Sequence, residues 1–321
     1  MINQKHNVWQ LDYMVTRKQK RRTMDRHCRF ILAHEINKAI DSISWPSTFQ
    51  EPDYVAKLVT TLPGVIKLSL RDLLPGRNIN VGGAFIHQKP LARFVNPPHS
   101  SLKNPELGDL LIVCREQRAS GHVYNALLLQ AKCTDDVYRT MIPADHQFIL
   151  YSQWPEFEYV RAGVFNGIRR SICPKTITQG AQYLLIDKNY PAGMFTATVD
   201  IPLEGVTRFP CTLSSVIAFE RGRTFQSGYP RDMWSNMIWD LLKISSNAVF
   251  NRRNSNYSNV DRWTGDSAFN FLLYNSQQDV IPVIDAREEN GQSSGVSVIC
   301  VDLGNDEKGD TSKYLFSIGL T

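Results

Sequence analysis

Two apolar runs separated by a short polar segment, between Leu107 and Lys132, constrain the fold of this chain more than any other feature. The runs read LLIV and ALLL, and the segment between them is largely polar and includes a glycine. Short apolar runs on either side of turn-forming residues are typical of paired β-strands. The sequence therefore predicts a β-hairpin with strongly apolar strands.

Polar residues stand at the ends of both predicted strands. Asp109 precedes the first run, and Gln130 and Lys132 close the second. Side chains on a strand alternate between its faces, so Gln130 and Lys132 share one face. A buried amide or ammonium group needs polar partners, so we expect this end of the hairpin to open to solvent. The pattern predicts a carboxylate, an amide oxygen and an ammonium group at one end of a sheet.

These groups suit the metal-dependent cleavage of a phosphodiester bond. Mg²⁺ prefers oxygen ligands, so Asp109 is the expected principal ligand and the Gln130 carbonyl oxygen a second. The metal would polarise the phosphate and lower the pKa of an attacking water. Lys132 would orient that water or stabilise the charge of the transition state.

A further carboxylate is expected to complete the metal site. Glu51 is the first choice, because it begins a predicted helix that leads into the sheet. Glu35, on an earlier predicted helix, is the second choice, and Glu106, close to Asp109, is the third. The predicted metal ligands are therefore Asp109, Gln130 and Glu51, and the sequence leaves the choice of the third ligand open among Glu51, Glu35 and Glu106.

The order of these residues resembles the PD-(D/E)XK nuclease superfamily. Asp109 matches the Asp of the family, Gln130 the D/E position and Lys132 the Lys, over a stretch from Glu51 to about Trp154. Gly108 stands where the family often has Pro. Glutamine keeps an oxygen ligand but removes one negative charge, so Mg²⁺ should bind more weakly.

The resemblance implies a fold and an activity. It implies an α/β protein with a restriction-endonuclease-like αβββαβ core, a mixed central sheet and a C-terminal α+β elaboration. It also implies cleavage of DNA with Mg²⁺, for which Mn²⁺ should substitute, in a bacterial anti-phage defence or restriction system. The alternative is a catalytically silent member that binds nucleic acid or a partner protein, and a third interpretation is a partner-binding protein without nucleic-acid function.

Other segments predict further helices and strands. Helices are expected at Arg22–Ser44, Glu51–Leu62, Pro143–Trp154 and Met233–Phe250. Strands are expected at Val65–Leu70, Tyr183–Asp187, Phe195–Val199, Val280–Ile284, Val296–Val301 and Tyr314–Ile318. We divide the chain into a helical segment (1–50), a nuclease core (51–200) and a C-terminal elaboration (201–321), with one domain as the alternative. Asp240 and Lys243 are expected to be surface charges.

Two later segments combine arginines with aromatic residues and are candidates for nucleic-acid contacts. The arginines are Arg221 and Arg223 in one segment, and Arg252, Arg253 and Arg262 in the other. Arginine forks fit phosphates, and aromatic rings can stack on bases. The pair Arg169–Arg170 is a weaker candidate, and solvated loops are the alternative for all of them. DNA is the expected partner, with a partner protein or a homodimer as further options.

The composition narrows the class of protein. The chain has 321 residues and a net charge of +5, which is compatible with a polyanionic partner but does not establish one. The chain has no run of about 18 apolar residues, so the sequence predicts no membrane span. The N-terminus lacks the apolar core of a signal peptide. The six cysteines form no C-x-x-C pair, so zinc is poorly supported and free thiols in the cytoplasm are expected.

Overall fold

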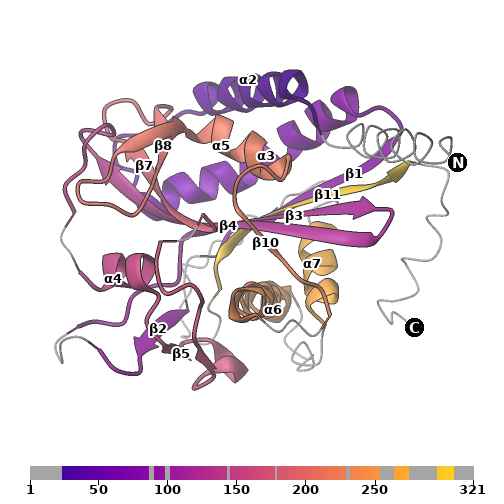
Figure 1. Cartoon of the computed structure of the whole chain (residues 1–321). Coiled ribbons are helices and arrows are strands. Elements are labelled where there is room, and N and C mark those ends of the chain that lie inside the picture. Colours follow the sequence, from indigo (N-terminus) through magenta and orange to yellow (C-terminus); the bar gives the residue numbers. More distant parts are fainter. Residues whose placement is uncertain are drawn as a thin grey trace, which may run out of the picture.

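The protein has an α/β fold built on a mixed sheet of eight strands with six α-helices in the described residues. The computed structural model describes residues 24–86, 90–97, 102–142, 145–177, 179–228, 232–253, 264–274 and 295–306. In Figure 1 the large sheet runs through the middle of the molecule, with helices above and below it. The described part of the chain is therefore a three-layer arrangement.

The helices and strands are as follows. The helices are α2 (Arg26–Ser42), α3 (Glu51–Leu73), α4 (His146–Gln153), α5 (Phe209–Ile217), α6 (Met233–Arg253) and α7 (Gly265–Tyr274). The large sheet contains β1 (Arg77–Ala84), β3 (Leu110–Arg118), β4 (Gly121–Thr134), β7 (Ala181–Asp187), β8 (Met194–Ala197), β9 (Gly205–Arg208), β10 (Arg223–Phe225) and β11 (Ser297–Asp306). A smaller sheet contains β2 (Leu91–Phe94), β5 (Phe157–Val160) and β6 (Arg169–Arg170).

The predicted hairpin is confirmed as strands β3 and β4 in the interior of the large sheet. The two strands are antiparallel, with Leu110 opposite Leu129 and Arg118 opposite Gly121. The sheet order is β1-β11-β3-β4-β7-β8-β9, and β10 pairs with the first half of β4. β4 and β7 are parallel, so their carboxyl ends meet at the same edge of the sheet.

The C-terminal strand β11 lies between β1 and β3. It is antiparallel to β1 and parallel to β3. Residues on both sides of the predicted boundary at residue 200 therefore contribute to one sheet. The chain contains α3, β1, β3, β4, α4 and β7 in this order, but they are not a continuous αβββαβ unit. In the chain β2 follows β1 and both β5 and β6 follow α4, and in the sheet β11 separates β1 from β3.

Each face of the large sheet has its own hydrophobic core. Helices α2, α3 and α5 cover one face, which is the upper face in Figure 1. Helices α4, α6 and α7, together with the small sheet, cover the other face. The two cores together bury both faces of β3 and β4, which is why these strands are so apolar. None of the helices that the structure describes is long and apolar enough to cross a membrane.

Helix α3 continues beyond its predicted end, and the strand predicted at Val65–Leu70 is wrong. The helix passes through Pro63 and Gly64 and ends only at Leu73. Ile66 and Leu70 are buried at helical spacing, whereas Leu68 is 65% exposed, so alternating apolar residues here do not mark a strand. A Cβ atom on Gly83 would lie 3.0 Å from Pro63 Cγ, so glycine in β1 allows the helix to pack closely on the strand.

Two further expectations need correction. Asp240 is a buried residue of α6 rather than a surface charge, because Tyr159 and Arg170 both donate hydrogen bonds to it. Helix α6 ends at Arg253, three residues after its predicted end. The strands predicted at Val280–Ile284 and Tyr314–Ile318 lie outside the described residues.

Candidate active site at the carboxyl ends of β4 and β7

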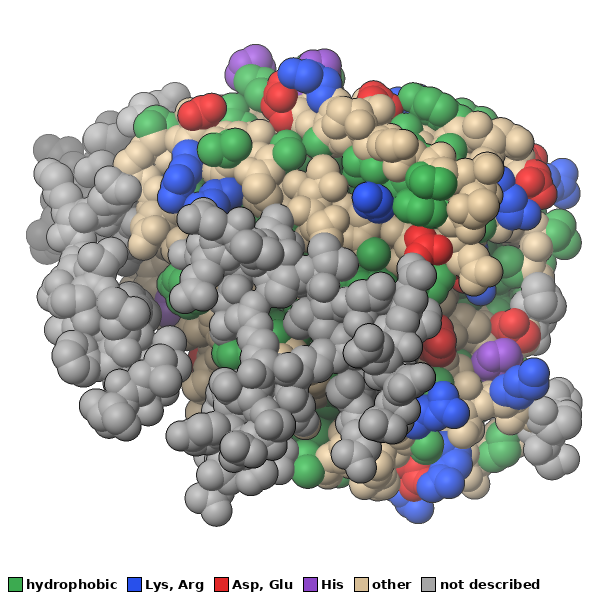
Figure 2. Space-filling model, turned by 180° about the vertical axis from the view of Figure 1, so that it is seen from behind, with side chains coloured by type: hydrophobic (Ala, Val, Ile, Leu, Met, Phe, Trp, Pro, Cys, Tyr) green, Lys and Arg blue, Asp and Glu red, His purple; other side chains and the backbone are tan. Residues whose placement is uncertain are grey.

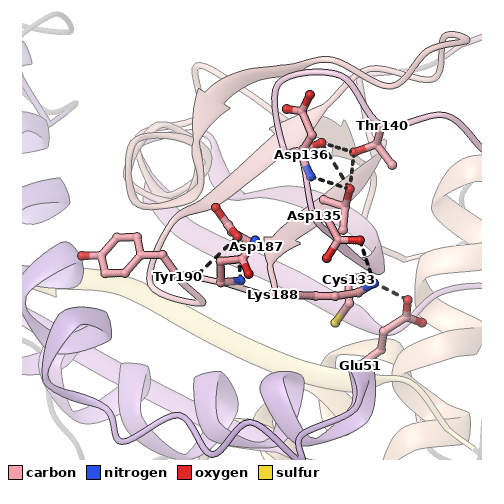
Figure 3. A network of polar contacts seen from close by, with 10 residues as sticks. Glu51, Cys133, Asp135, Asp136, Thr140, Asp187, Lys188 and Tyr190 are labelled. Atoms are coloured by element: carbon pink, nitrogen blue, oxygen red, sulfur yellow. Dashed lines mark hydrogen bonds and ion pairs between the residues drawn. The ribbon is translucent and has the colours of Figure 1, made fainter.

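Four elements meet where β4 and β7 end. β4 ends at Thr134 and β7 ends at Asp187, and these two residues are paired. The first turn of α3 lies at the same edge, since Glu51 accepts a hydrogen bond from the backbone of Cys133 (Figure 3). The start of β3 is there too, because Asp109 bonds to Leu129 and Ala131. Ligands commonly bind at the carboxyl ends of parallel strands, so this edge is a reasonable place for a site.

Asp109 and Gln130 form one half of the candidate site. The backbone N–H of Asp109 donates to Leu129 O at 2.8 Å, which fixes Asp109 beside the end of β4. Its carboxylate accepts hydrogen bonds from the Ala131 N–H, at 2.6 Å, and from the Gln130 amide. Both side chains are buried, with 1% of Asp109 and 3% of Gln130 exposed. The buried carboxylate is therefore held by donors from the neighbouring strand.

The Gln130 amide leaves one polar atom unsatisfied. Its oxygen Oε1 is buried and has no hydrogen-bond partner among the described residues. Two other orphaned atoms belong to the same side of the sheet: Tyr183 Oη on β7, opposite Gln130, and Gln147 Nε2 on α4. Buried polar atoms are nearly always paired, so an orphaned oxygen next to a carboxylate suggests a ligand-binding position.

Glu51 and Lys132 form the other half. Lys132 Nζ lies 3.8 Å from Glu51 Oε2, and about one third of each side chain is exposed (36% and 32%). The other Glu51 oxygen accepts a hydrogen bond from the Cys133 N–H at 3.1 Å. A carboxylate in the first turn of a helix is favoured by the helix dipole, which helps to place Glu51 at this edge. This half of the site is open to solvent, whereas the Asp109–Gln130 half is buried.

The three acids considered as the further carboxylate have different surroundings. Glu51 contacts Lys132. Glu35 instead forms an exposed ion pair with Lys38 on α2, 3.3 Å long. Glu106 forms a β-bridge with Leu91, and its charge acts on Tyr151 next to the Asp109 loop. Of the three acids, Glu51 is therefore the one that contacts Lys132.

A buried tyrosine supports the loop that carries Asp109. Tyr151, on α4, donates a hydrogen bond to Leu107 O at 2.9 Å. Gly108 lies between Leu107 and Asp109, and a Cβ atom there would approach Leu128 Cδ1 to 2.7 Å and Tyr151 Oη to 3.0 Å. A side chain at Gly108 would force the buried Leu128 to shift, which gives a physical reason for glycine at this position. The sequence singled out Gly108 only as a departure from the family pattern.

Charged groups from several segments act on the Cys133 thiol. Burial raises the pKa of the Cys133 thiol to about 11, and the charge of Glu51 adds to this increase. Lys188 and Lys132 lower the pKa, and Asp109 raises it. Four charged groups from separate segments therefore lie around one half-buried thiol. The sequence analysis missed Lys188, although this lysine directly follows the predicted strand Tyr183–Asp187.

Of the arginines proposed for nucleic-acid contacts, Arg223 lies away from these strand ends, in β10. Arg223 pairs with Ala126, in the first half of β4, and its guanidinium donates to Cys173 O and lies over the Trp234 ring. Arg221 is exposed. Arg252 and Arg253 lie in the last turn of α6, but their side chains, like all of Arg262, are outside the described residues.

Two other observations bear on nucleic-acid binding. Arg170 is engaged by the buried Asp240, which removes it as a free phosphate contact, while Arg169 is exposed. On the face seen in Figure 2, basic side chains lie in small groups with acidic side chains between them. The described part of this face is therefore mixed in charge.

A divalent cation would find few acidic ligands at this edge of the sheet. Within the described ranges, no three His, Cys, Asp or Glu side chains gather closely enough to hold a metal ion. Mg²⁺ needs only one or two carboxylates when waters and a phosphate complete its shell. The Asp109 carboxylate and the orphaned Gln130 oxygen fit this need, with Glu51 at the open side.

No family model, no curated protein and no solved structure matches this chain.

Proposed function

We propose that this protein is a metal-dependent nuclease that hydrolyses phosphodiester bonds of DNA, on a PD-(D/E)XK-like core formed by α3, β1, β3, β4, α4 and β7. One observation carries the proposal. Residues singled out in the sequence lie in two contacting pairs, Asp109 with Gln130 across the β3–β4 hairpin and Glu51 of α3 with Lys132 of β4. The hairpin accounts for the first pair, but a chance match to a short motif gives no reason for the second.

Each side chain has a distinct role in this proposal. Asp109 and the Gln130 oxygen would hold a divalent cation, Mg²⁺ or Mn²⁺, which supplies charge stabilisation at the phosphate when it is bound. Because the Gln130 amide now points its N–H toward Asp109, the amide must turn before its oxygen can face the same cation. Lys132 would stabilise negative charge on the phosphate or orient the attacking water. Glu51 would hold Lys132 in position and take part in binding the cation.

A bacterial defence or restriction role belongs to the same proposal and rests on the resemblance of the motif. The second candidate function, a catalytically silent subunit, is favoured by one specific observation. Gln130 closes over Asp109 and leaves that carboxylate almost fully buried. A subunit of this kind would bind DNA or a partner protein and cleave nothing.

The test is DNA cleavage with a matched pair of variants. Plasmid DNA and linear DNA are incubated with the protein in Mg²⁺, Mn²⁺ or EDTA, alongside Glu51→Gln and Glu35→Gln. We expect metal-dependent cleavage that falls at least about tenfold in Glu51→Gln, because this acid holds Lys132, and that is unchanged in Glu35→Gln. DNA binding without cleavage in either metal would favour the silent subunit, and equal cleavage by the two variants would refute the site.

A further inference from the structure

The edge next to the candidate site carries a lysine that the proposed reaction does not use. Lys188 follows β7 directly, and its N–H bonds to Thr134 O at 2.9 Å, which fixes its backbone over the end of β4. Its ammonium group lies 3.3 Å from Asp135 Oδ2 (Figure 3). Both side chains are exposed, 51% for Lys188 and 76% for Asp135. Exposed pairs of this kind contribute little to stability, so Lys188 is free to exchange Asp135 for a phosphate.

An exposed aromatic ring lies in the loop that follows Asp135. Tyr138 is 67% exposed, and its ring packs edge-on against Phe195 of β8, with centroids 5.3 Å apart. The Asp136 carboxylate accepts hydrogen bonds from the N–H groups of Tyr138 (2.9 Å) and Arg139 (3.2 Å), which hold the turn in shape. The ring is therefore fixed at its edge and at its backbone while most of it faces solvent.

A further cation lies over Phe195, the ring on which Tyr138 packs. The Arg208 guanidinium lies 5.9 Å from the centroid of Phe195, the residue on which Tyr138 also packs. Arg208 is exposed and belongs to β9, a short strand of four residues. Lys188 therefore follows β7, Tyr138 packs on β8, and Arg208 belongs to β9, so all three lie on the β7–β8–β9 side of the sheet.

We propose that this edge binds a single-stranded or locally unpaired stretch of nucleic acid, with Lys188 on a backbone phosphate and the Tyr138 ring stacked on an unpaired base. The inference rests on the proposed function, because it names the form of substrate that the same site takes. Exposed aromatic rings beside cations are how proteins bind single strands without reading their sequence. A base inside a duplex has no free face to offer to Tyr138.

The acidic residues at this edge argue against an intact duplex as the preferred form. Asp135, Asp136 and Asp187 all lie here, and two of them accept hydrogen bonds that shape the local turns. Duplex binding draws its affinity from many phosphate contacts, which carboxylates at the same edge oppose. Stacking on an aromatic ring does not depend on charge, so it tolerates these neighbours. The chemistry of the edge therefore favours an unpaired strand.

The test is binding in EDTA, where no metal-dependent cleavage occurs. A fluorescent thymine oligonucleotide and a duplex of the same length are titrated with the wild type and the variants Tyr138→Ala, Tyr138→Phe, Lys188→Ala and Asp135→Asn. Tyr138→Ala should weaken single-strand binding about tenfold or more, and Tyr138→Phe should retain it, because phenylalanine also stacks. Lys188→Ala should weaken binding and lower the salt slope by about 0.7, the value for one phosphate contact on a single strand.

Asp135→Asn gives the sharpest control, because it should act in the opposite direction. Removing this carboxylate frees Lys188, so single-strand binding should tighten. If the ion pair had only a structural role, Asp135→Asn and Lys188→Ala would both weaken single-strand binding or both leave it unchanged. The pair Lys38 and Glu35 on α2 has the same N–O distance of 3.3 Å, so Lys38→Ala and Glu35→Gln report the general effect of losing one exposed charge.

The outcomes separate this inference from the nuclease proposal. Tighter duplex than single-strand binding by the wild type, or single-strand affinity unchanged by both Tyr138→Ala and Lys188→Ala, would overturn the inference even if the protein cleaves DNA. Loss of single-strand binding in both variants would support it even if no cleavage is found. If the wild type binds neither form at low salt, this edge is not a nucleic-acid surface.

Discussion

Near one end of β3, the Arg115 guanidinium is buried and donates three hydrogen bonds. Next to the other end, Asp109 is buried beside Gln130, whose side-chain oxygen has no hydrogen-bond partner among the described residues. Arg115 donates two hydrogen bonds to Asp302 on β11, at 2.8 and 3.0 Å, and one to Asn270 on α7, at 2.8 Å. Burial alone would lower the pKa of Arg115, but the hydrogen bonds and charge of Asp302 outweigh it and raise the pKa.

The same contrast extends to the neighbours of each residue. Next to Arg115, Tyr124 donates a hydrogen bond to Asp266, and Glu116 is paired with both Arg77 and Arg118. At the candidate site, Gln130 Oε1 is orphaned and the Glu51–Lys132 pair is long and partly exposed. Saturated buried networks fix a fold, whereas unsatisfied groups at an open edge are available to a ligand. Among the described residues, only the end of the hairpin near Asp109 leaves a buried side-chain polar atom without a partner, and this end is therefore available to a ligand.

The largest expected effect is on stability, at the saturated end. Arg115→Met should lower the free energy of unfolding by about 3–5 kcal/mol, because it leaves Asp302 buried without its cation. Lys132→Met, at the open end, should cost under about 1 kcal/mol, since that pair is long and one third exposed. Urea unfolding measures both. Equal losses in the two variants would show that the two ends do not differ as described.

The next effect is on activity, at the open end. Asp109→Asn should reduce metal-dependent cleavage at least about a hundredfold, because it removes the charged ligand of the cation. The variant keeps an oxygen that can accept from Ala131, so its unfolding free energy should change by no more than about 1–2 kcal/mol. Gel-based cleavage and urea unfolding are measured on the same preparation. Full activity in Asp109→Asn would remove this residue from the site.

Gln130→Glu should change how much a bound metal stabilises the protein at the open end of the hairpin. Without metal, two carboxylates would face each other in a buried position, so the melting temperature should fall. With Mg²⁺ or Mn²⁺, the added charge should strengthen binding, and the melting temperature should rise more than in the wild type. Thermal unfolding with metal and with EDTA tests this. A variant that is destabilised equally in both conditions would mark Gln130 as purely structural.

The smallest effect concerns the reactivity of Cys133. Its pKa of about 11 is raised by burial first and by Glu51 second, so Glu51→Gln should lower it and Lys188→Ala should raise it. Exposed charges contribute about 0.2–1 kcal/mol, which corresponds to about half a pKa unit. Because the thiolate is the reactive form, alkylation by iodoacetamide near pH 9 should be faster in Glu51→Gln and slower in Lys188→Ala. Mass spectrometry of the Cys133 peptide gives the rates, and changes of the same sign in both variants would refute the proposed arrangement.

Much of this site could be predicted because its signals are local. The hairpin follows from two apolar runs, and the shared face of Gln130 and Lys132 follows from strand alternation. Glu51 was chosen because it begins a predicted helix that leads into the sheet, but its contact with Lys132 was not predicted, because spacing within the sequence does not specify which helix end approaches which strand. Lys188 was missed because its importance depends on the parallel pairing of β4 with β7, which is a long-range feature.

The errors have equally physical causes. At Val65–Leu70, alternation suggested a strand, but tertiary packing of Ile66 and Leu70 on the sheet extends the helix. Asp240 looked like a helix surface charge because its partners, Tyr159 and Arg170, come from a small sheet that the sequence did not predict. The insertion of β11 between β1 and β3 depends on chain topology, which no local pattern encodes.

The most direct test of the central claim is a comparison of cleavage and binding in Lys132→Met. The account predicts that the wild type cleaves DNA with Mg²⁺ or Mn²⁺ and not in EDTA. It predicts that Lys132→Met unfolds at nearly the same urea concentration, binds DNA within a few-fold of the wild type and loses cleavage by about a hundredfold or more. Cleavage by Lys132→Met at the wild-type rate would contradict the account, and so would wild-type cleavage that persists in EDTA.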